Sequence, residues 1–282
     1  MWLSFIRFLK QDRTAQILLV LFAMLAMWWT VLQVLGYEEV SEGRNLIWAA
    51  SYQVIAIFGG VAGLVISASW GSTKSVMGKA MLCFAFGLLL QSFGQSVFSF
   101  YNLALQVDIP YPSLADVGYF GSIPLYIYGI LLLAKLSGVK VSLRSFLNKI
   151  QALLIPLAML TFSYFFFLRG YELDWSDPLK VFLDFGYPLG QAVYVSIAIL
   201  TYILSKGVLG GIMQPKVLFI LLALVVQYTA DYNFLYQATN GTWQNGGYGD
   251  FIYLLAYLFM ALGLLQLEVR HIIMMKEKNS RI

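Results

Sequence analysis

The sequence predicts an all-α integral membrane protein, a bundle of eight transmembrane helices arranged as four hairpin repeats with both termini in the cytoplasm. Composition is the first reason: 60% of the 282 residues are hydrophobic and only 11% are charged, whereas soluble domains carry about 25% charged residues. The second is the recurrence of apolar runs near the length of about 20 residues that a spanning helix needs. The third is the distribution of Lys and Arg among the loops between these runs.

The apolar runs set the expected helix boundaries. We expect spans at about 15–36, 46–70, 79–104, 114–137, 147–168, 178–205, 214–238 and 248–270. Before them, residues 1–14 mix Trp2 and Phe5 with Arg7 and Lys10, a pattern typical of an interfacial amphipathic helix. A cleaved signal peptide is the alternative, but no small-residue cleavage site follows the first long run. The expected domains are therefore 1–14, an interfacial helix; 15–270, the transmembrane domain; and 271–282, a cytoplasmic tail.

The basic residues orient the bundle. When the loops are assigned alternately to two sides, all of the 18 Lys and Arg residues fall on one side except Arg44, Arg169 and Lys180. Because Lys and Arg accumulate in short cytoplasmic loops, this side is the cytoplasm. An odd number of spans would destroy the segregation, so both termini are predicted to be cytoplasmic.

Carboxylates begin three of the later apolar spans, and each is followed three residues later by tyrosine. The pairs are Asp116/Tyr119, Asp184/Tyr187 and Asp250/Tyr253. The three aspartates are separated by 68 and 66 residues, a spacing that suggests repeated helical hairpins. In the first pair, Ser113 precedes Asp116 by three residues, which also fits a helix capping box.

Two aspartates are expected inside the bilayer. Asp184 lies about two turns into the sixth span, and Asp231 lies within the seventh, one turn after Gln227. An acid at such depth costs several kcal/mol unless it faces a partner or water, so both are predicted to face the bundle interior. Two readings stay open: a ligand or proton site, or a polar pair that locks two helices together.

Four segments in order carry a resemblance to a known family. They are Pro112-Ser-Leu-Ala-Asp-Val-Gly-Tyr119, Asp184-Phe-Gly-Tyr-Pro-Leu-Gly-Gln191, Ala230-Asp231 and Gly249-Asp-Phe-Ile-Tyr-Leu-Leu-Ala-Tyr257. Over roughly residues 80–268, the chain resembles the multi-span N-terminal membrane sensor region that precedes GGDEF and EAL cyclic-di-GMP domains in bacterial signalling proteins. It departs from that pattern in two places: Gln191, which cannot ionise, stands where the family usually has Asp, and Tyr253 stands where Trp is common. The sequence ends at Ile282 without the catalytic domain of those proteins.

The resemblance implies a membrane-embedded sensor or receptor module that binds a small ligand in an outward-facing polar-aromatic pocket and signals through the C-terminal helix. The expected ligand-binding residues are Asp116, Tyr119, Asp184, Tyr187, Gln191, Gln227, Asp231, Asp250 and Tyr253. The four aspartates are expected to approach one common cavity between the even-numbered spans and the seventh. One alternative is a transporter or proton-coupled carrier; another is an accessory or scaffold subunit of a membrane complex that binds lipid, quinone or carotenoid.

An enzyme is the least supported class, because the sequence has no phosphate-binding loop or Gly-x-Ser-x-Gly motif and its acids are scattered. A single histidine, His271, and a single cysteine, Cys83, cannot supply a haem or metal ligand set. No catalytic residue, metal site or named cofactor is therefore predicted. The expected partners are the lipid bilayer, a small-molecule or lipid ligand, and a cytoplasmic signalling partner or a second copy in a homodimer; nucleic acid is not expected. The resemblance places the protein in the bacterial cytoplasmic membrane.

Overall fold

The computed structural model describes residues 2–35, 42–205 and 214–269, and within them every regular element is helical. The helices are α1 (Trp2–Gln11), α2 (Arg13–Leu35), α3 (Glu42–Ser51), α4 (Val54–Ser69), α5 (Val76–Ser99), α6 (Leu114–Leu136), α7 (Val139–Ser142), α8 (Phe146–Ser163), α9 (Pro178–Ser205), α10 (Gln214–Thr239) and α11 (Tyr248–Leu265). Three short segments extend or join them: η1 (Ser72–Lys74), η2 (Phe100–Leu105) and η3 (Tyr164–Leu168).

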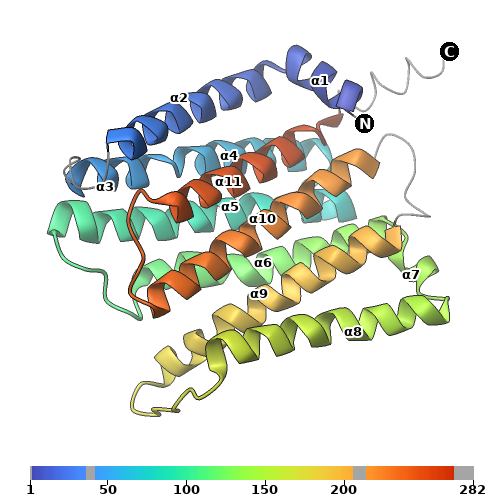
Figure 1. Cartoon of the computed structure of the whole chain (residues 1–282). Coiled ribbons are helices and arrows are strands. Elements are labelled where there is room, and N and C mark those ends of the chain that lie inside the picture. The colour runs from blue at the N-terminus through green and yellow to red at the C-terminus, as the bar shows by residue number, and fades with distance from the viewer. Residues whose placement is uncertain (1, 36–41, 206–213, 270–282) are drawn as a thin grey trace.

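Eight helical segments in the described ranges are long and apolar enough to cross a membrane, so the fold is that of an integral membrane protein. Each corresponds to one of the spans expected from the sequence. The chain reverses direction from one span to the next, and the start of α1 and the end of α11 therefore lie at the same end of the bundle (Figure 1).

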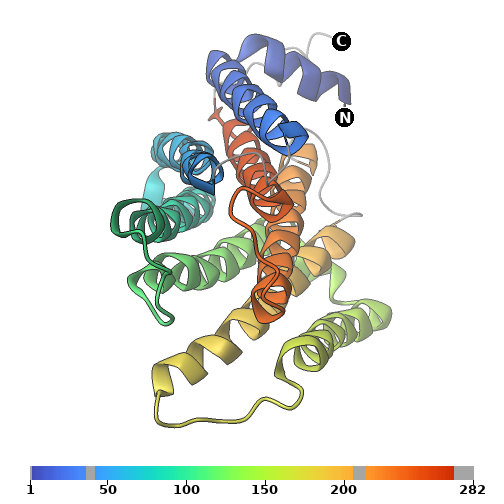
Figure 2. The same ribbon diagram turned by 60° about the vertical axis from the view of Figure 1, so that its left-hand side comes forward.

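Six of the spans close into a ring. Around it, α4 packs on α5, α5 on α6, α6 on α9, α9 on α10, α10 on α11, and α11 returns to α4. The other two spans lie outside: α2 against α11, and α8 against α9 (Figures 1 and 2). A ring of helices can enclose a space at its centre, and its walls come from helices distant in the sequence.

Small residues allow the ring helices to approach closely, as is common in membrane bundles. A Cβ atom added to Gly59 of α4 would lie 2.5 Å from the Cβ atom of Ala261 in α11. A Cβ added to Gly118 of α6 would lie 2.4 Å from the backbone oxygen of Leu90 in α5. These contacts fix the spacing and rotation of neighbouring helices around the ring.

The second expected span differs in detail from the structure. Instead of one helix over 46–70, the chain forms α3 and α4, with a break at Tyr52 and Gln53. At the break, the backbone N–H of Ile55 donates to the carbonyl of Tyr52 at 3.2 Å, three residues back rather than four. The break turns the Tyr52 side chain into the ring, where it contributes to the site described below.

The last span is shorter than predicted. α11 ends at Leu265, whereas the sequence predicted a span to residue 270. The reason is that side chains bind the carbonyls after Leu265: Lys216 Nζ donates to the Gln266 carbonyl, and Trp70 Nε1 donates to the Leu267 carbonyl at 2.8 Å. A lysine at the C-terminal end of a helix stabilises its free carbonyls. Residues 270–278 lie outside the described ranges.

The predicted N-terminal amphipathic segment is also shorter than residues 1–14. α1 ends at Gln11, and the side chain of Asp12 caps α2 by accepting from the Ala15 N–H at 2.7 Å. Phe5 of α1 stacks on Phe219 of α10 with ring centroids 5.1 Å apart. This contact attaches α1 to the end of the bundle at which α11 finishes.

Candidate functional site

A cavity of about 600 Å³ lies inside the ring, toward the end of the bundle that carries the loops before α6, α9 and α11. Its walls come from α5, α6, α9, α10 and α11, together with the loops before α6 and α11 and Tyr52. The polar lining residues are Gln91, Gln95, Ser113, Asp116, Lys180, Asp184, Gln191, Asp231, Thr239 and Asp250. The aromatic ones are Tyr52, Phe98, Tyr111, Tyr119, Tyr187, Phe234, Trp243, Tyr253 and Tyr257.

The structure brings together eight of the nine residues that the sequence singled out, including all four aspartates. The ninth, Gln227, does not line the cavity, but its amide Nε2 donates to Asp231 Oδ1 at 2.9 Å and so orients that carboxylate. α5 also lines the cavity, whereas the sequence placed the cavity between the even-numbered spans and the seventh. That the assembled residues bind a ligand stays a prediction.

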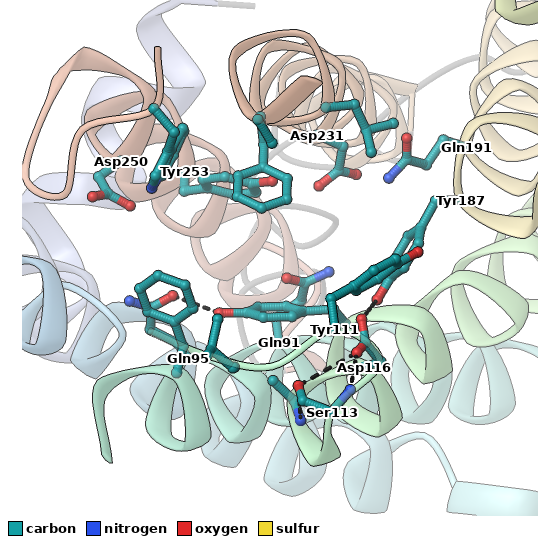
Figure 3. Close-up of a pocket in the computed structure, with 18 of the residues that line it drawn as sticks. Gln91, Gln95, Tyr111, Ser113, Asp116, Tyr187, Gln191, Asp231, Asp250 and Tyr253 are labelled. Carbon is teal, nitrogen blue, oxygen red and sulfur yellow. Dashed lines mark hydrogen bonds between the residues drawn. The ribbon is translucent and has the colours of Figure 1, made fainter. Parts of the chain in front are cut away.

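Asp116 occupies the first turn of α6. The Ser113 side chain caps this helix, and the Ser113 N–H donates to Asp116 Oδ2 at 2.7 Å, which confirms the predicted capping box. The other oxygen, Oδ1, accepts from the Tyr187 hydroxyl of α9 at 2.7 Å (Figure 3). One carboxylate thus begins α6 and ties it to α9.

Asp184, two turns into α9, binds two tyrosines from loops. Its Oδ1 accepts from the Tyr111 hydroxyl at 2.8 Å, and its Oδ2 accepts from the Tyr171 hydroxyl at 2.5 Å. These hydrogen bonds matter for ionisation: the bond to Asp184 raises the pKa of Tyr171 to about 12, and burial followed by the bond to Asp184 raises the pKa of Tyr111 above its usual value. Both phenols therefore remain protonated donors at neutral pH.

Asp231 and Asp250 are the most buried of the four aspartates, with exposed fractions of 6% and 3%. Asp231 Oδ2 accepts from the Tyr194 hydroxyl of α9 at 2.7 Å. Asp250 Oδ1 accepts from the Tyr52 hydroxyl at 2.9 Å, and its Oδ2 accepts from the Gly246 N–H at 2.7 Å. Both buried carboxylates are thus held by donors from other parts of the chain, as buried polar groups require.

One pattern covers the four aspartates. Every one of their eight carboxylate oxygens accepts a hydrogen bond, and every aspartate has at least one tyrosine hydroxyl as its donor. All of these donors are uncharged. The four carboxylates are thus positioned by neutral donors.

Two glutamines of α5 complete the floor of the cavity. Gln95 Oε1 accepts from the hydroxyls of Tyr119 at 2.7 Å and Tyr52 at 3.2 Å. Gln91 Oε1 accepts from the Tyr257 hydroxyl at 3.3 Å. These bonds tie α5 to α6 and α11.

Gln191 of α9 differs from the other polar lining residues. It is only 4% exposed, yet its Oε1 has no hydrogen-bond partner among the described residues. Figure 3 shows its amide directed toward Asp231 across the upper part of the cavity. A buried acceptor without a donor costs about 1–3 kcal/mol, so this position has an unmet requirement that a bound group can satisfy.

The tyrosines of the Asp-x-x-Tyr pairs do not bind their own aspartates. Tyr187 donates to Asp116, from the preceding pair, and Tyr119 donates to Gln95. Sequence reasoning missed the donors Tyr52, Tyr111 and Tyr194. The only signal for them was the high tyrosine content, 18 in the chain, which does not say which residues meet.

The described residues contain no group of three or more His, Cys, Asp or Glu side chains that could hold a metal ion. The four aspartates surround the cavity individually, each with its own donors.

In the comparisons with known proteins, no family model, curated protein or solved structure matches this chain.

Proposed function

We propose that this protein is a membrane-embedded receptor, which binds a small ligand in the cavity and transmits its presence along α11. The observation that carries the proposal is the cavity itself: about 600 Å³, with four aspartates and Gln191 Oε1, which has no hydrogen-bond partner among the described residues, in its walls. Ligand sites in proteins are typically concave, mostly apolar spaces of about 300–1,000 Å³ with a few placed polar groups. The resemblance to bacterial sensor regions supports the same function.

The proposed orientation places the cavity toward the outside of the bacterial cytoplasmic membrane. Lys74, Lys79, Lys135 and Lys140 lie on segments at the opposite end of the ring, which fits the cytoplasmic side. The ends of the described chain, at α1 and α11, share that side. A ligand that arrives from outside would then be reported to the cytoplasm.

α11 joins the two ends of the receptor. Asp250, Tyr253 and Tyr257 line the cavity in its first three turns. Farther along, Ala261 packs on Gly59 of α4 and Gly263 packs on Ile220 of α10. Because such contacts leave no room for independent movement, a shift at the cavity end must be shared by the ring or carried to the end of α11.

The end of α11 is where the signal would leave the membrane. Its last carbonyls accept from Trp70, just after α4, and from Lys216 of α10. These two donors hold the helix end in one position relative to its neighbours. A movement of α11 that changes these bonds would reposition whatever follows Leu267.

The packing favours a receptor over a carrier. A carrier needs access to its site from both sides of the membrane in turn. Here, all four aspartates lie at one end, while the other end of the ring is filled by fully buried apolar residues such as Phe84, Ile130, Leu133 and Leu264. The ring thus supports binding from one side.

The test compares the wild type with Asp231→Asn in detergent, with and without a small-molecule extract of the cells in which the protein is made. Asn keeps the shape of Asp and most of its hydrogen bonds, so we expect the variant to fold. We expect the extract to raise the melting temperature of the wild type but not of the variant. At 100 times the dissociation constant, a ligand adds about 2.7 kcal/mol to stability.

The matched control is Asp108→Asn, which removes a charge from an exposed residue in the loop before α6 that does not line the cavity. This variant should respond to the extract as the wild type does. Equal shifts in all three proteins would show that binding does not involve the cavity. Unfolding of Asp231→Asn without extract would assign that residue a structural role only.

A further inference from the structure

We propose that the ligand of this cavity is a small organic cation with N–H groups, an alkyl- or arylammonium or a guanidinium, carried on an apolar body. This inference rests on the proposed receptor function and names the chemical class of the ligand that the same cavity would bind. Three features of the cavity lead to it: the balance of charge, the balance of hydrogen-bond donors and acceptors, and the aromatic walls.

Charge is the first feature. The cavity lining includes four aspartates but only one basic residue, Lys180, which is exposed at the rim beside Asp184. The hydrogen bonds that the aspartates accept all come from uncharged hydroxyl, amide and backbone groups. Buried carboxylates are costly without an opposite charge, so a bound cation would supply the positive charge that these carboxylates lack.

The second feature is a shortage of donors. The hydroxyls of Tyr52, Tyr111, Tyr119, Tyr187 and Tyr257 all donate to acids or glutamines of the same cavity. The amide groups of Gln91 and Gln95 donate to Ser122 Oγ and the Ala49 carbonyl. The donors of these lining residues are therefore already used inside the protein.

Acceptors, by contrast, remain. A carboxylate oxygen can accept more than one hydrogen bond, so most of these oxygens keep a free lone pair; Asp116 Oδ2 already accepts from both the N–H and the hydroxyl of Ser113. Gln191 Oε1, in a side chain that is buried in the cavity wall, has no donor at all among the described residues. A ligand that donates several hydrogen bonds satisfies these groups, whereas one that mainly accepts them does not.

The third feature is the aromatic wall. Tyr119, Tyr253, Tyr257 and Trp243 line the same space as the aspartates. The face of an aromatic ring attracts a cation electrostatically and also packs well against an apolar body. Because the described residues hold no three-ligand metal cluster, the geometry favours an organic cation over a metal ion.

The experiment measures binding of matched pairs of probes to the full chain in detergent, at neutral pH. Each pair is an amine, charged at this pH, and the neutral alcohol of the same shape: the n-alkylamines from n-butylamine to n-decylamine and 2-phenylethylamine, each against its alcohol. We expect at least one amine to bind with a dissociation constant lower than that of its alcohol by about tenfold or more.

Two variants of opposite charge test where the cation lies. Asp231→Asn removes a negative charge and should weaken amine binding; Gln191→Glu adds one in nearly the same shape and should strengthen it. Neither substitution should shift the affinity for alcohols in the direction in which it shifts the affinity for amines. Asp108→Asn should leave the affinity for every probe unchanged. If Asp231→Asn fails to fold, the affinity of Gln191→Glu for amines, compared with that of the wild type, still tests where the cation lies.

Two outcomes contradict the inference. In the first, alcohols bind as tightly as amines, or neutral compounds from the extract bind and lose affinity in Asp231→Asn; the receptor proposal then stands and the cation assignment fails. In the second, no amine binds in preference to its alcohol and no extract component stabilises the wild type. In that case the proposed function fails as well.

Discussion

Replacing Gly118 by alanine is expected to lower the free energy of unfolding by roughly 1–3 kcal/mol, because it overpacks the contact between α5 and α6. The added Cβ would lie 2.4 Å from the Leu90 carbonyl oxygen and 2.5 Å from the Gly94 backbone nitrogen. Both are backbone atoms of α5, so the helices must separate to make room. Chemical or thermal unfolding in detergent measures the change.

The matched control is Gly121→Ala, on the same helix. Its added Cβ would approach Leu90 Cδ1 at 3.4 Å, an ordinary contact with a flexible side chain. Alanine is the better helix former by about 1 kcal/mol at both positions, so this variant should be neutral or slightly more stable. Equal stability of the two variants would contradict the packing described for α5 and α6.

Tyr194→Phe is expected to destabilise the protein by about 1–3 kcal/mol. The change removes the 2.7 Å hydrogen bond to Asp231 Oδ2 and leaves that oxygen without its donor in a buried position. The ring remains and its packing is kept, so the cost reports the lost bond rather than a cavity. Unfolding in detergent again provides the measurement.

Tyr257→Phe is the control. Both tyrosines are 1% exposed, but Tyr257 donates a longer bond of 3.3 Å to an amide, Gln91 Oε1, not to a carboxylate. We expect a smaller loss than for Tyr194→Phe. The double variant Tyr194→Phe/Asp231→Asn should lose less than the sum of the single changes, because the two residues share one interaction. Additive losses would mean that the hydroxyl does not stabilise the carboxylate.

The spans were predictable from the sequence because the length and apolarity of a membrane helix are local properties. The convergence of Asp184 and Asp231 was predictable too, since an acid deep in a span must avoid lipid. The cavity-lining positions of Asp116 and Asp250, near the starts of α6 and α11, follow from the same preference. The length and apolarity of a span, and the cost of an acid that faces lipid, together determine which face of each helix points into the bundle.

The partners of the aspartates were not predictable, because they depend on how helices rotate against one another. The Tyr119 ring lies on Gly94, within 3 Å of the position of an added Cβ, and this contact directs its hydroxyl to Gln95 rather than to Asp116. Tyr52, which donates to Asp250, lies at the break between α3 and α4, and the sequence did not predict this break. The end of α11 likewise depends on Trp70 and Lys216, which come from other spans.

The most direct test of the receptor proposal is a high-resolution density map of the protein purified in the presence of its strongest-binding amine. The proposal predicts density for one molecule within the ring, with a nitrogen within hydrogen-bond distance of Asp231 and Gln191 Oε1. It also predicts that the Lys216 and Trp70 bonds at the end of α11 differ from those of the ligand-free protein. A cavity that holds only water or a lipid chain, with the amine elsewhere, would contradict it.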